Sequence, residues 1–452
     1  MTDDRSIASQ TEKDGPESKP VIERPPKNTI ASQPEVGINP FQAVTLVLGF
    51  VATATVFFLG GILYERQQGI AYSQDFEIFW EAWEYIDEEY YQEPPPVSER
   101  VYGGIDGVLR ALGDEYSSVS PPVQAEQHRE EIEGKFGGIG AYVDINDDEE
   151  PYIVDIVADE CIATTPAERA GLQANDVIRA VDGQEVKGWA IEDVIDIVKG
   201  KSGTDVTLTI YRPEDDEAFD VTIERDEVEQ ITVVDRDFEN VGYVHLRVFN
   251  SIAAEQMKCK LESIIADNPQ AIIFDLRGNG GGLLDEAIDV ADLFLDNGVV
   301  VSQRDRDGKE EERFSDSGDL AEGIPLVVLI DGGSASASEV VAGALQDRGQ
   351  AVLIGQTSFG KGSVQNVHVL ADGGELRITS AAWYTPDGRR IHGIGLEPDI
   401  FVDLAQTTED NPDPVLDRAL EYIAEHYSPA TDAAASSPEA SSEAEAVTAR
   451  IG

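Results

Sequence analysis

Hydrophobic and polar residues follow three different patterns along the chain, and each predicts a different kind of structure. Between residues 74 and 132, apolar residues recur at spacings of three and four on either side of a Pro-rich break, which predicts two amphipathic helices. From 135 to 226, short alternating runs predict a small mixed domain of strands, with helices at 166–171 and 191–200. From 231 to 404, strands alternate with helices, as in α/β layering. The pattern therefore predicts an α/β multidomain protein.

A long uncharged segment lies near the start of the chain. Phe41–Leu63 carries no charge, and at 1.5 Å per residue its 23 residues cover about 35 Å, enough to cross a hydrocarbon core of about 30 Å. A buried core helix and a cleaved signal peptide are the alternatives, but the run is longer than most globular helices and no small-residue cleavage site follows it. More basic residues precede the segment than closely follow it. The pattern therefore predicts a single-pass signal anchor in the cell membrane, with the N-terminus cytoplasmic and the rest extracytoplasmic.

Polar ends flank the segments that are predicted to fold. The first 39 residues scatter Pro among charges, and the residues from Ser428 onward are rich in Ala, Ser and Glu, so both ends are predicted to be disordered tails. The predicted organisation begins with a cytoplasmic tail (1–39), a transmembrane signal anchor (40–63) and a helical N-terminal region (64–133). A small mixed β domain (134–226), an α/β core (227–404) and a C-terminal segment with an acidic tail (405–452) follow.

The composition argues against several functions. The chain has 88 acidic and 33 basic side chains, for a formal net charge of -55, whereas binding to nucleic acid requires Lys and Arg to neutralise phosphates. No nucleic-acid partner is therefore predicted. The acidic, lysine-poor composition also suggests adaptation to salt. Two cysteines, Cys161 and Cys259, cannot form a disulfide framework, and no Cys/His spacing predicts a metal.

Two Gly-rich segments resemble nucleotide sites only in part. Gly278–Gly282 follows a predicted strand, but a dinucleotide fingerprint needs Gly where Leu283 stands. Gly355–Lys361 matches a phosphate-binding loop up to the lysine, but Gly362 replaces the Ser or Thr that would hold magnesium, and a strand-like alternation follows. No cofactor or metal is therefore predicted. The amides of the first segment could still stabilise an oxyanion, the alternative being a tight turn with no other role.

A serine-rich turn and this lysine could together form a catalytic pair. A buried lysine can lose its proton and act as a general base. The turn Asp331–Glu339 opens a predicted helix of about 11 residues, or about 16 Å, and a strand of about five residues returns about 16 Å, which brings Lys361 beside the helix start. The alternative is a helix cap completed by Glu339. A Ser-His-Asp triad is the weaker enzymatic option, because no GxSxG motif is present and no histidine has an evident serine partner.

These segments, taken together, resemble a known family. The run SASASE at 334–339, the loop SFGKGSVQ at 358–365, the strand and turn DLRGNGGGLL at 275–284 and the segment at 378–399 resemble the carboxyl-terminal processing, or tail-specific, serine peptidases. The likeness covers most of residues 74–404 and includes a PDZ-like domain, with FGGIGAYV and PAERAGLQANDVIRAVDG. It implies a Ser-Lys protease core of the crotonase-like fold.

The resemblance also implies roles for single residues. Ser336, the middle serine, corresponds to the nucleophile, Lys361 to the base and Gln365 to a residue that helps to orient the lysine. The oxyanion hole would use the amides of Ala337 and Gly281. The family commonly has Pro where Gly280 stands, and this replacement loosens the turn that would supply the second amide.

The PDZ-like domain is predicted to select substrates. In PDZ domains an extended peptide adds a strand to a sheet edge while loop amides bind its terminal carboxylate. The residues that fit this loop and strand are Gly137, Gly138, Ile139, Gly140, Ala141 and Tyr142, and a simple hairpin turn is the alternative. A longer segment than usual in this domain carries Cys161, which is predicted to be a surface thiol.

The prediction is a membrane-anchored serine endopeptidase that binds protein C-termini through its PDZ-like domain and cleaves near them through an acyl-enzyme. Its expected partners are proteins or peptides with free, apolar C-termini, the membrane through one helix, and a homo-oligomer or an adaptor protein. The competing hypothesis is a non-catalytic, membrane-tethered PDZ scaffold.

Overall fold

The computed structural model describes residues 76–317, 320–321, 323–408 and 411–427. The chain divides into two compact units, Met1–Pro94 and Pro95–Gly452, and each is described by itself. In the first unit, helix α2 (Glu77–Glu89) buries no residue, and Phe79, Trp80 and Trp83 contact one another on its surface. All other elements that the structure describes belong to the second unit.

The transmembrane part of the predicted fold class requires correction. The predicted anchor at 40–63 and both predicted tails lie outside the described residues. Within the described part of the chain, no helix is both long and apolar enough to cross a bilayer. The longest, α3 (Val97–Ala111), has 15 residues and covers about 23 Å. The fold is therefore a mixed α/β multidomain fold without the predicted membrane-spanning helix among its described elements.

A small β domain occupies the first half of the second unit. Its main sheet has the order β3-β4-β5-β7-β8, with β6 paired to β5, while β2 pairs with β9. The strands are β2 (Lys135–Gly138), β3 (Ala141–Ile145), β4 (Pro151–Ile156), β5 (Val177–Val181), β6 (Gln184–Glu185), β7 (Asp205–Arg212), β8 (Glu217–Glu224) and β9 (Asp226–Glu229), and the helices are α5 (Pro166–Arg169) and α6 (Ile191–Val198). Alternation along β7 buries Val206, Leu208 and Ile210 in one core. Strand β3 is an edge strand, and α6 packs against it.

The α/β core is built on a six-stranded sheet of order β10-β11-β12-β15-β16-β19. Its strands are β10 (Val233–Phe238), β11 (Val241–Leu246), β12 (Ala271–Asp275), β15 (Leu326–Ile330), β16 (Ala351–Gly355) and β19 (Ile400–Phe401). Strand β10 is antiparallel to β11, and the other neighbours are parallel. Parallel strands need crossover connections, which accounts for the strand–helix alternation seen in the sequence.

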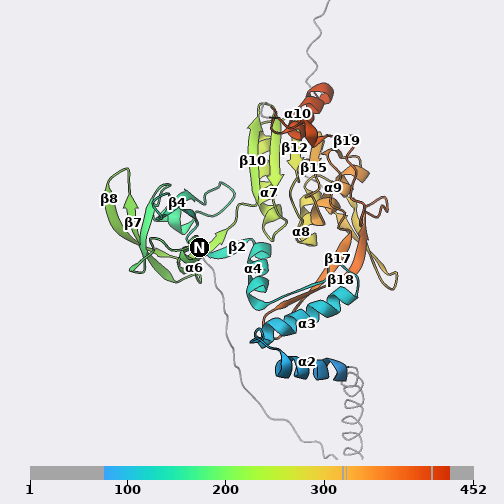
Figure 1. Cartoon of the computed structure of the whole chain (residues 1–452). Coiled ribbons are helices and arrows are strands. Elements are labelled where there is room, and N and C mark those ends of the chain that lie inside the picture. Colours follow the sequence, from blue (N-terminus) through green and yellow to red (C-terminus); the bar gives the residue numbers. More distant parts are fainter. Residues whose placement is uncertain (1–75, 318–319, 322, 409–410, 428–452) are drawn as a thin grey trace, which may run out of the picture. The chain divides into compact units, whose positions relative to one another are not determined.

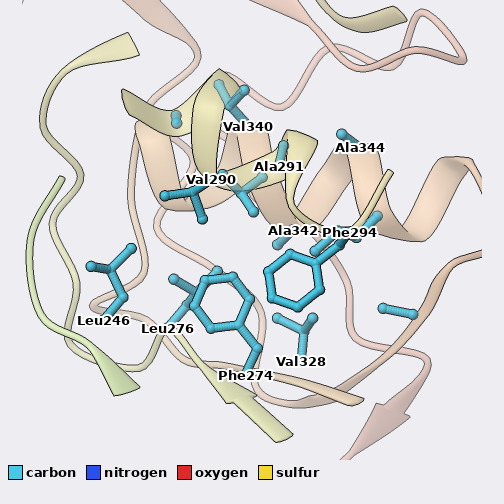
Figure 2. Packing of buried hydrophobic residues seen from close by; sticks show 14 of the residues in the cluster. Leu246, Phe274, Leu276, Val290, Ala291, Phe294, Val328, Val340, Ala342 and Ala344 are labelled. Atoms are coloured by element: carbon cyan, nitrogen blue, oxygen red, sulfur yellow. The ribbon is translucent and has the colours of Figure 1, made fainter. Parts of the chain in front are cut away.

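Both faces of this sheet are buried. Helices α7 (Ala253–Ala266), α8 (Leu284–Asp292) and α9 (Ala337–Asp347) share one hydrophobic cluster with Ile272 and Phe274, whereas α10 (Pro414–Tyr427) shares another with Ala271 and Ile273 (Figure 1). Figure 2 shows the first cluster, in which Phe274 stacks on Phe294 with ring centroids 5.4 Å apart. Successive residues of one strand thus face different helices, so β15 is apolar at every position and β12 is apolar from Ala271 to Phe274.

A second sheet lies beside this core. Its order is β1-β18-β13-β14, with β17 paired to β18. The strands are β1 (Ser118–Ser120), β13 (Gly298–Asp305), β14 (Glu310–Ser315), β17 (Ser363–Val369) and β18 (Glu375–Tyr384), and the remaining elements are helix α4 (Pro122–Glu133) and the 3-10 helix η1 (Leu404–Gln406). Because β1 pairs with β18 across more than 250 residues of sequence, this sheet places the start of the second unit next to the loop that follows β16.

The prediction of a surface thiol at Cys161 is wrong. The longer loop of the β domain reaches α7, where Cys161 forms a disulfide with Cys259. The neighbouring Lys260 is buried, and its ammonium lies 2.9 Å from Asp159 and 3.0 Å from Asp235. Burial alone lowers the pKa of Lys260, but hydrogen bonds to these two carboxylates outweigh it and raise the pKa. A covalent bond and a buried ion cluster therefore connect the β domain to the core.

Candidate active site

Three adjacent parallel strands deliver the candidate site residues to one edge of the core sheet. β12, β15 and β16 are neighbours, and the Gly-rich turn, the serine turn and the lysine loop follow their respective carboxyl ends. Ligand and catalytic groups of open α/β sheets lie at this edge. The strand order thus brings Gly281, Ser336 and Lys361 together, although they are far apart in sequence.

Hydrogen bonds tie the Gly-rich turn to the serine turn. Asp331 Oδ1 accepts hydrogen bonds from the amides of Gly278 at 2.9 Å and Ser334 at 3.1 Å. The hydroxyl of Ser334 donates to the Leu276 carbonyl, and that of Ser338 to the Asn279 carbonyl, each at 2.8 Å. Both serines are fully buried. Two of the three serines in the run therefore hold the turns in place, and only Ser336 is partly accessible.

Ser336 has an unusual backbone conformation. Its φ is 56° and its ψ is -113°, at the point where the turn after β15 enters α9. A non-glycine residue at positive φ costs of order 1–3 kcal/mol and is found most often at functional sites. Gly281 lies directly opposite, with φ 104°, and a Cβ added there would come within 2.8 Å of Ser336 Cβ. The sharp turn presents Ser336 to the cleft, and glycine is needed across from it.

Glu339 connects the backbones of the two candidate catalytic residues. Its Oε2 accepts hydrogen bonds from the amide of Ser336 at 2.8 Å and from the amide of Lys361 at 2.9 Å. Its Oε1 accepts from the Gly360 amide at 2.7 Å and from the Ser358 hydroxyl at 2.6 Å. The side chain is fully buried, and burial raises its pKa despite these four hydrogen bonds. One carboxylate oxygen therefore fixes Ser336 next to Lys361.

The backbone amide and the backbone carbonyl of Lys361 both form hydrogen bonds, and its side chain is partly shielded from water. Its carbonyl accepts a hydrogen bond of 3.1 Å from the Trp383 indole, and its amine lies 5.6 Å from the centroid of the Tyr116 ring. Burial lowers the pKa of Lys361, the positive charge of Arg377 lowers it further, and Glu339 opposes both. The net direction favours the neutral amine, which a general base requires.

These residues line a cleft of about 660 Å³. Its wall includes Gly281, Ser336, Ala337, Lys361 and Gln365, which are the five catalytic and oxyanion-hole residues proposed from the sequence. Apolar side chains, Leu283, Val340 and Trp383 among them, line the same cleft. A cleft of this size with an apolar wall and a few polar groups is typical of a substrate site.

Two predicted roles have a less direct basis in the geometry. The side-chain amide of Gln365 donates to Ser363 Oγ at 2.9 Å and to Thr379 Oγ1 at 3.4 Å. Its donor nitrogen therefore points to strands of the second sheet. The amide of Gly281 donates to Asn279 Oδ1 at 2.9 Å. Ala337, in contrast, is the first residue of α9, whose N-terminal amides have no intrahelical acceptor. The roles of Gln365 and Gly281 remain predictions.

The six residues proposed for peptide binding lie together in the β domain. Gly137 and Gly138 end β2, and Ala141 and Tyr142 begin the edge strand β3. Between them, Ile139 is buried and Gly140 has a φ of 81°. Tyr142 is 49% exposed. The loop is therefore continuous with a free strand edge, as β-strand addition requires.

Sequence reasoning missed several residues that shape the site. Tyr116, Trp383 and Arg377 had no local signature, because each acts through partners distant in sequence. Asp331 begins the serine turn noted in the sequence, but its bond to Gly278 joins segments more than 50 residues apart. Glu339 did have a signal, its spacing from Ser336, but the spacing indicated only a helix cap. Its second role, binding the lysine loop, depends on the crossover from α9 to β16.

The chain matches two known families over parts of its length and known proteins over most of it. Residues 240–402 match peptidase family S41, and residues 160–212 match a PDZ domain. A carboxy-terminal-processing protease of Bartonella bacilliformis is 36% identical over 367 residues, covering 80% of this chain and 82% of that protein. A probable CtpA-like serine protease of Staphylococcus aureus is 32% identical over 381 residues, covering 82% and 74%. Among solved structures, a photosystem II D1 C-terminal processing protease shares 28% identity over 73% of this chain and 89% of its own, with a TM-score of 0.42.

Proposed function

The chain belongs to peptidase family S41 and is a serine-type, carboxyl-terminal processing peptidase with a PDZ domain, and on this premise we propose that Ser336 and Lys361 are its catalytic dyad. The observation that carries the proposal is the Glu339 carboxylate, whose single oxygen binds the backbone amides of both residues at the wall of the cleft. Its burial and its four donors make this arrangement rigid, as catalysis by a fixed pair requires.

The proposed reaction proceeds through an acyl-enzyme. The neutral amine of Lys361 takes the proton of Ser336 Oγ while Oγ bonds to the carbon of the scissile carbonyl. The amide of Ala337 stabilises the negative oxygen, and the amide of Gly281 would join it by leaving Asn279 Oδ1, its acceptor in this structure. The protonated lysine then gives its proton to the leaving amine as the C–N bond breaks. Water, deprotonated by the same lysine, then attacks the ester carbon. As the bond from that carbon to Ser336 Oγ breaks, the lysine returns the proton to Oγ and the acid is released, while Gln365 helps to position Lys361.

Covalent labelling tests the nucleophile directly. A fluorophosphonate, which phosphonylates activated serines, is expected to modify the wild-type protein stoichiometrically at Ser336. The measurement is mass spectrometry of the peptide that contains the serine turn, with fragmentation to distinguish Ser336 from Ser334 and Ser338. The latter two donate to buried carbonyls and are expected to stay unmodified. A folded protein that cleaves no peptide and takes up no probe would support the scaffold hypothesis instead.

We further propose that the PDZ domain binds the free C-terminus of the substrate. A peptide would add to the open edge of β3, and the amides of residues 137–140 would bind its carboxylate. Ile191 and Ile195 on α6, which packs against β3, are half-buried and follow the i, i+4 spacing that places two side chains on one helix face. These apolar side chains support a preference for an apolar terminal residue.

Amidation of the substrate C-terminus tests this binding mode. A peptide with a free, apolar C-terminus is expected to be cleaved with a kcat/KM about 10-fold or more above that of its amidated twin, because a charge-assisted set of hydrogen bonds is lost. Ile195→Asp is expected to lower kcat/KM for the free peptide and to reduce this difference. Glu192→Ala, an exposed position on the same helix, is the matched control. Equal rates for the two peptides in the wild-type protein would refute carboxylate recognition.

An extracytoplasmic location is the last part of the proposal. The Cys161–Cys259 disulfide supports it, since disulfides persist mainly in oxidising compartments. A homo-oligomer and an adaptor protein stay predictions.

A further inference from the structure

An aromatic side chain from the start of the second unit contacts the lysine loop. The ring of Tyr116 lies with its centroid 5.6 Å from Lys361 Nζ, although 245 residues separate the two in sequence. The same ring also contacts His392, whose imidazole meets it edge to face with ring centroids 5.7 Å apart. Tyr116 is half-buried. The ring therefore contacts both the amine and the loop after β18.

The turn that carries Tyr116 is itself fixed. The carboxylate of Asp114 accepts hydrogen bonds from the amides of Tyr116 at 3.2 Å and Ser117 at 3.0 Å, and from the Ser117 hydroxyl. The Thr379 amide in turn donates to Ser117 Oγ at 3.1 Å, which connects the turn to β18. Immediately afterwards β1 pairs with the first residues of β18. The turn that carries Tyr116 is therefore fixed both by its own hydrogen bonds and by its attachment to β18.

The backbone of Lys361 is fixed, whereas its side chain can still change rotamer. Glu339 binds the amide and Trp383 binds the carbonyl, so the Cα position is set. A lysine side chain nevertheless has four rotatable bonds and much rotamer entropy to lose. A rigid ring against its amine removes alternative positions and also displaces water from one side.

We propose that Tyr116 is a positioning residue for the general base, and that its ring covers one side of the Lys361 amine and keeps it directed at the cleft. The proposal rests on the Ser336–Lys361 dyad proposed above. The distance of 5.6 Å is close to the limit of about 6 Å for a cation–π attraction. The main effect of the ring is therefore exclusion of water and not stabilisation of the charged amine.

The groups around the amine give the direction of the expected pH effect. Arg377 of β18 and Glu339 of α9 act on Lys361 with opposite signs, and burial is the largest influence on its pKa. Tyr116 itself is neutral at physiological pH, since burial and the charges of Glu115, Glu339 and Asp114 raise its pKa. His392 contacts the same ring. Removing the ring leaves these charges in place and admits water, so the pKa of Lys361 rises and the neutral amine appears only at higher pH.

The test compares Tyr116→Ala, Tyr116→Phe and Tyr116→Leu in peptide cleavage as a function of pH. For Tyr116→Ala, kcat/KM at pH 7 is expected to fall about 10-fold, a part of the roughly 10²–10⁴-fold that a general base contributes. Its pH–rate profile is expected to move to higher pH. Tyr116→Phe keeps the ring and is expected to retain the wild-type profile. Tyr116→Leu fills the space but covers less of the amine, so its profile should move in the same direction by less.

The controls separate this inference from the dyad and from folding. Tyr91→Ala removes a tyrosine that is 85% exposed and is expected to change nothing, and melting temperatures report on the fold of each variant. A loss of kcat/KM by the same factor at every pH, or a Tyr116→Phe variant as impaired as Tyr116→Ala, overturns the proposal. If instead the wild-type protein leaves Ser336 unlabelled, or Lys361→Ala cleaves normally, the dyad itself is wrong. The outcomes are therefore distinguishable.

Discussion

Ser336→Ala is expected to lower kcat for peptide cleavage by at least about 10⁴-fold, because it removes the atom that would form the acyl-enzyme. Some residual rate over the uncatalysed reaction should remain, since the cleft and the amide of Ala337 still bind substrate. The fold should be retained. The Ser336 amide keeps its hydrogen bond to Glu339, and alanine meets the same strain at positive φ as serine does.

The measurement is single-turnover cleavage of a peptide with a free C-terminus, together with binding of the same peptide. Binding by Ser336→Ala is expected to match that of the wild-type protein, because the PDZ domain is unchanged. Ser98→Ala, an exposed serine on α3, is the matched control and should cleave normally. Cleavage by Ser336→Ala within about 10-fold of the wild-type rate would assign the nucleophile to another group.

Lys361→Met is expected to lower kcat/KM at pH 7 by about 10²–10⁴-fold, because methionine keeps the unbranched chain and loses the base. Lys361→Arg should be no better, since a guanidinium stays protonated in proteins and cannot accept the serine proton. Lys309→Met, at an exposed position on the second sheet's turn, is the matched control and should retain wild-type activity. Normal cleavage by the arginine variant would exclude a neutral lysine as the base.

The pH dependence of the wild-type protein follows from the same lysine. Burial and Arg377 lower the pKa of Lys361 below its ordinary value of 10.5. The neutral form is present above the lowered pKa, so kcat/KM should rise with pH and level off below pH 10.5. Lys361→Met should lose this limb of the profile.

Local sequence signals predicted the elements that carry the site. The alternation of strands and helices, the helix entered at Ser336 and the strand at 351–355 are confirmed by α9 and β16. These elements are encoded by periodicity within about ten residues, and the segment Val340–Leu345 of α9 is both buried and apolar on every side. The family and the peptidase activity predicted from the motifs are confirmed by the comparisons.

Local sequence signals did not predict the contacts between segments that are distant in sequence. Helix α10 and the sheet that joins β1 to β18 were not predicted, and Cys161 was taken for a free thiol although it pairs with Cys259 across 98 residues. The spacing of two cysteines does not reveal whether a loop of one domain reaches a helix of the next. The membrane helix, in contrast, was predicted from a local signal, the length of an uncharged apolar segment.

The sequence by itself determined the class of enzyme, the strands and helices that carry the site, and the serine and lysine that we place in the dyad, because these depend on short motifs and local periodicity. Only the tertiary structure decided how these residues are held. The order β12-β15-β16 brings three turns to one edge, Glu339 binds Ser336 and Lys361 through one oxygen, and Tyr116 reaches the amine from 245 residues away. Burial and neighbouring charge, which set the protonation of a base, exist only after the chain has folded.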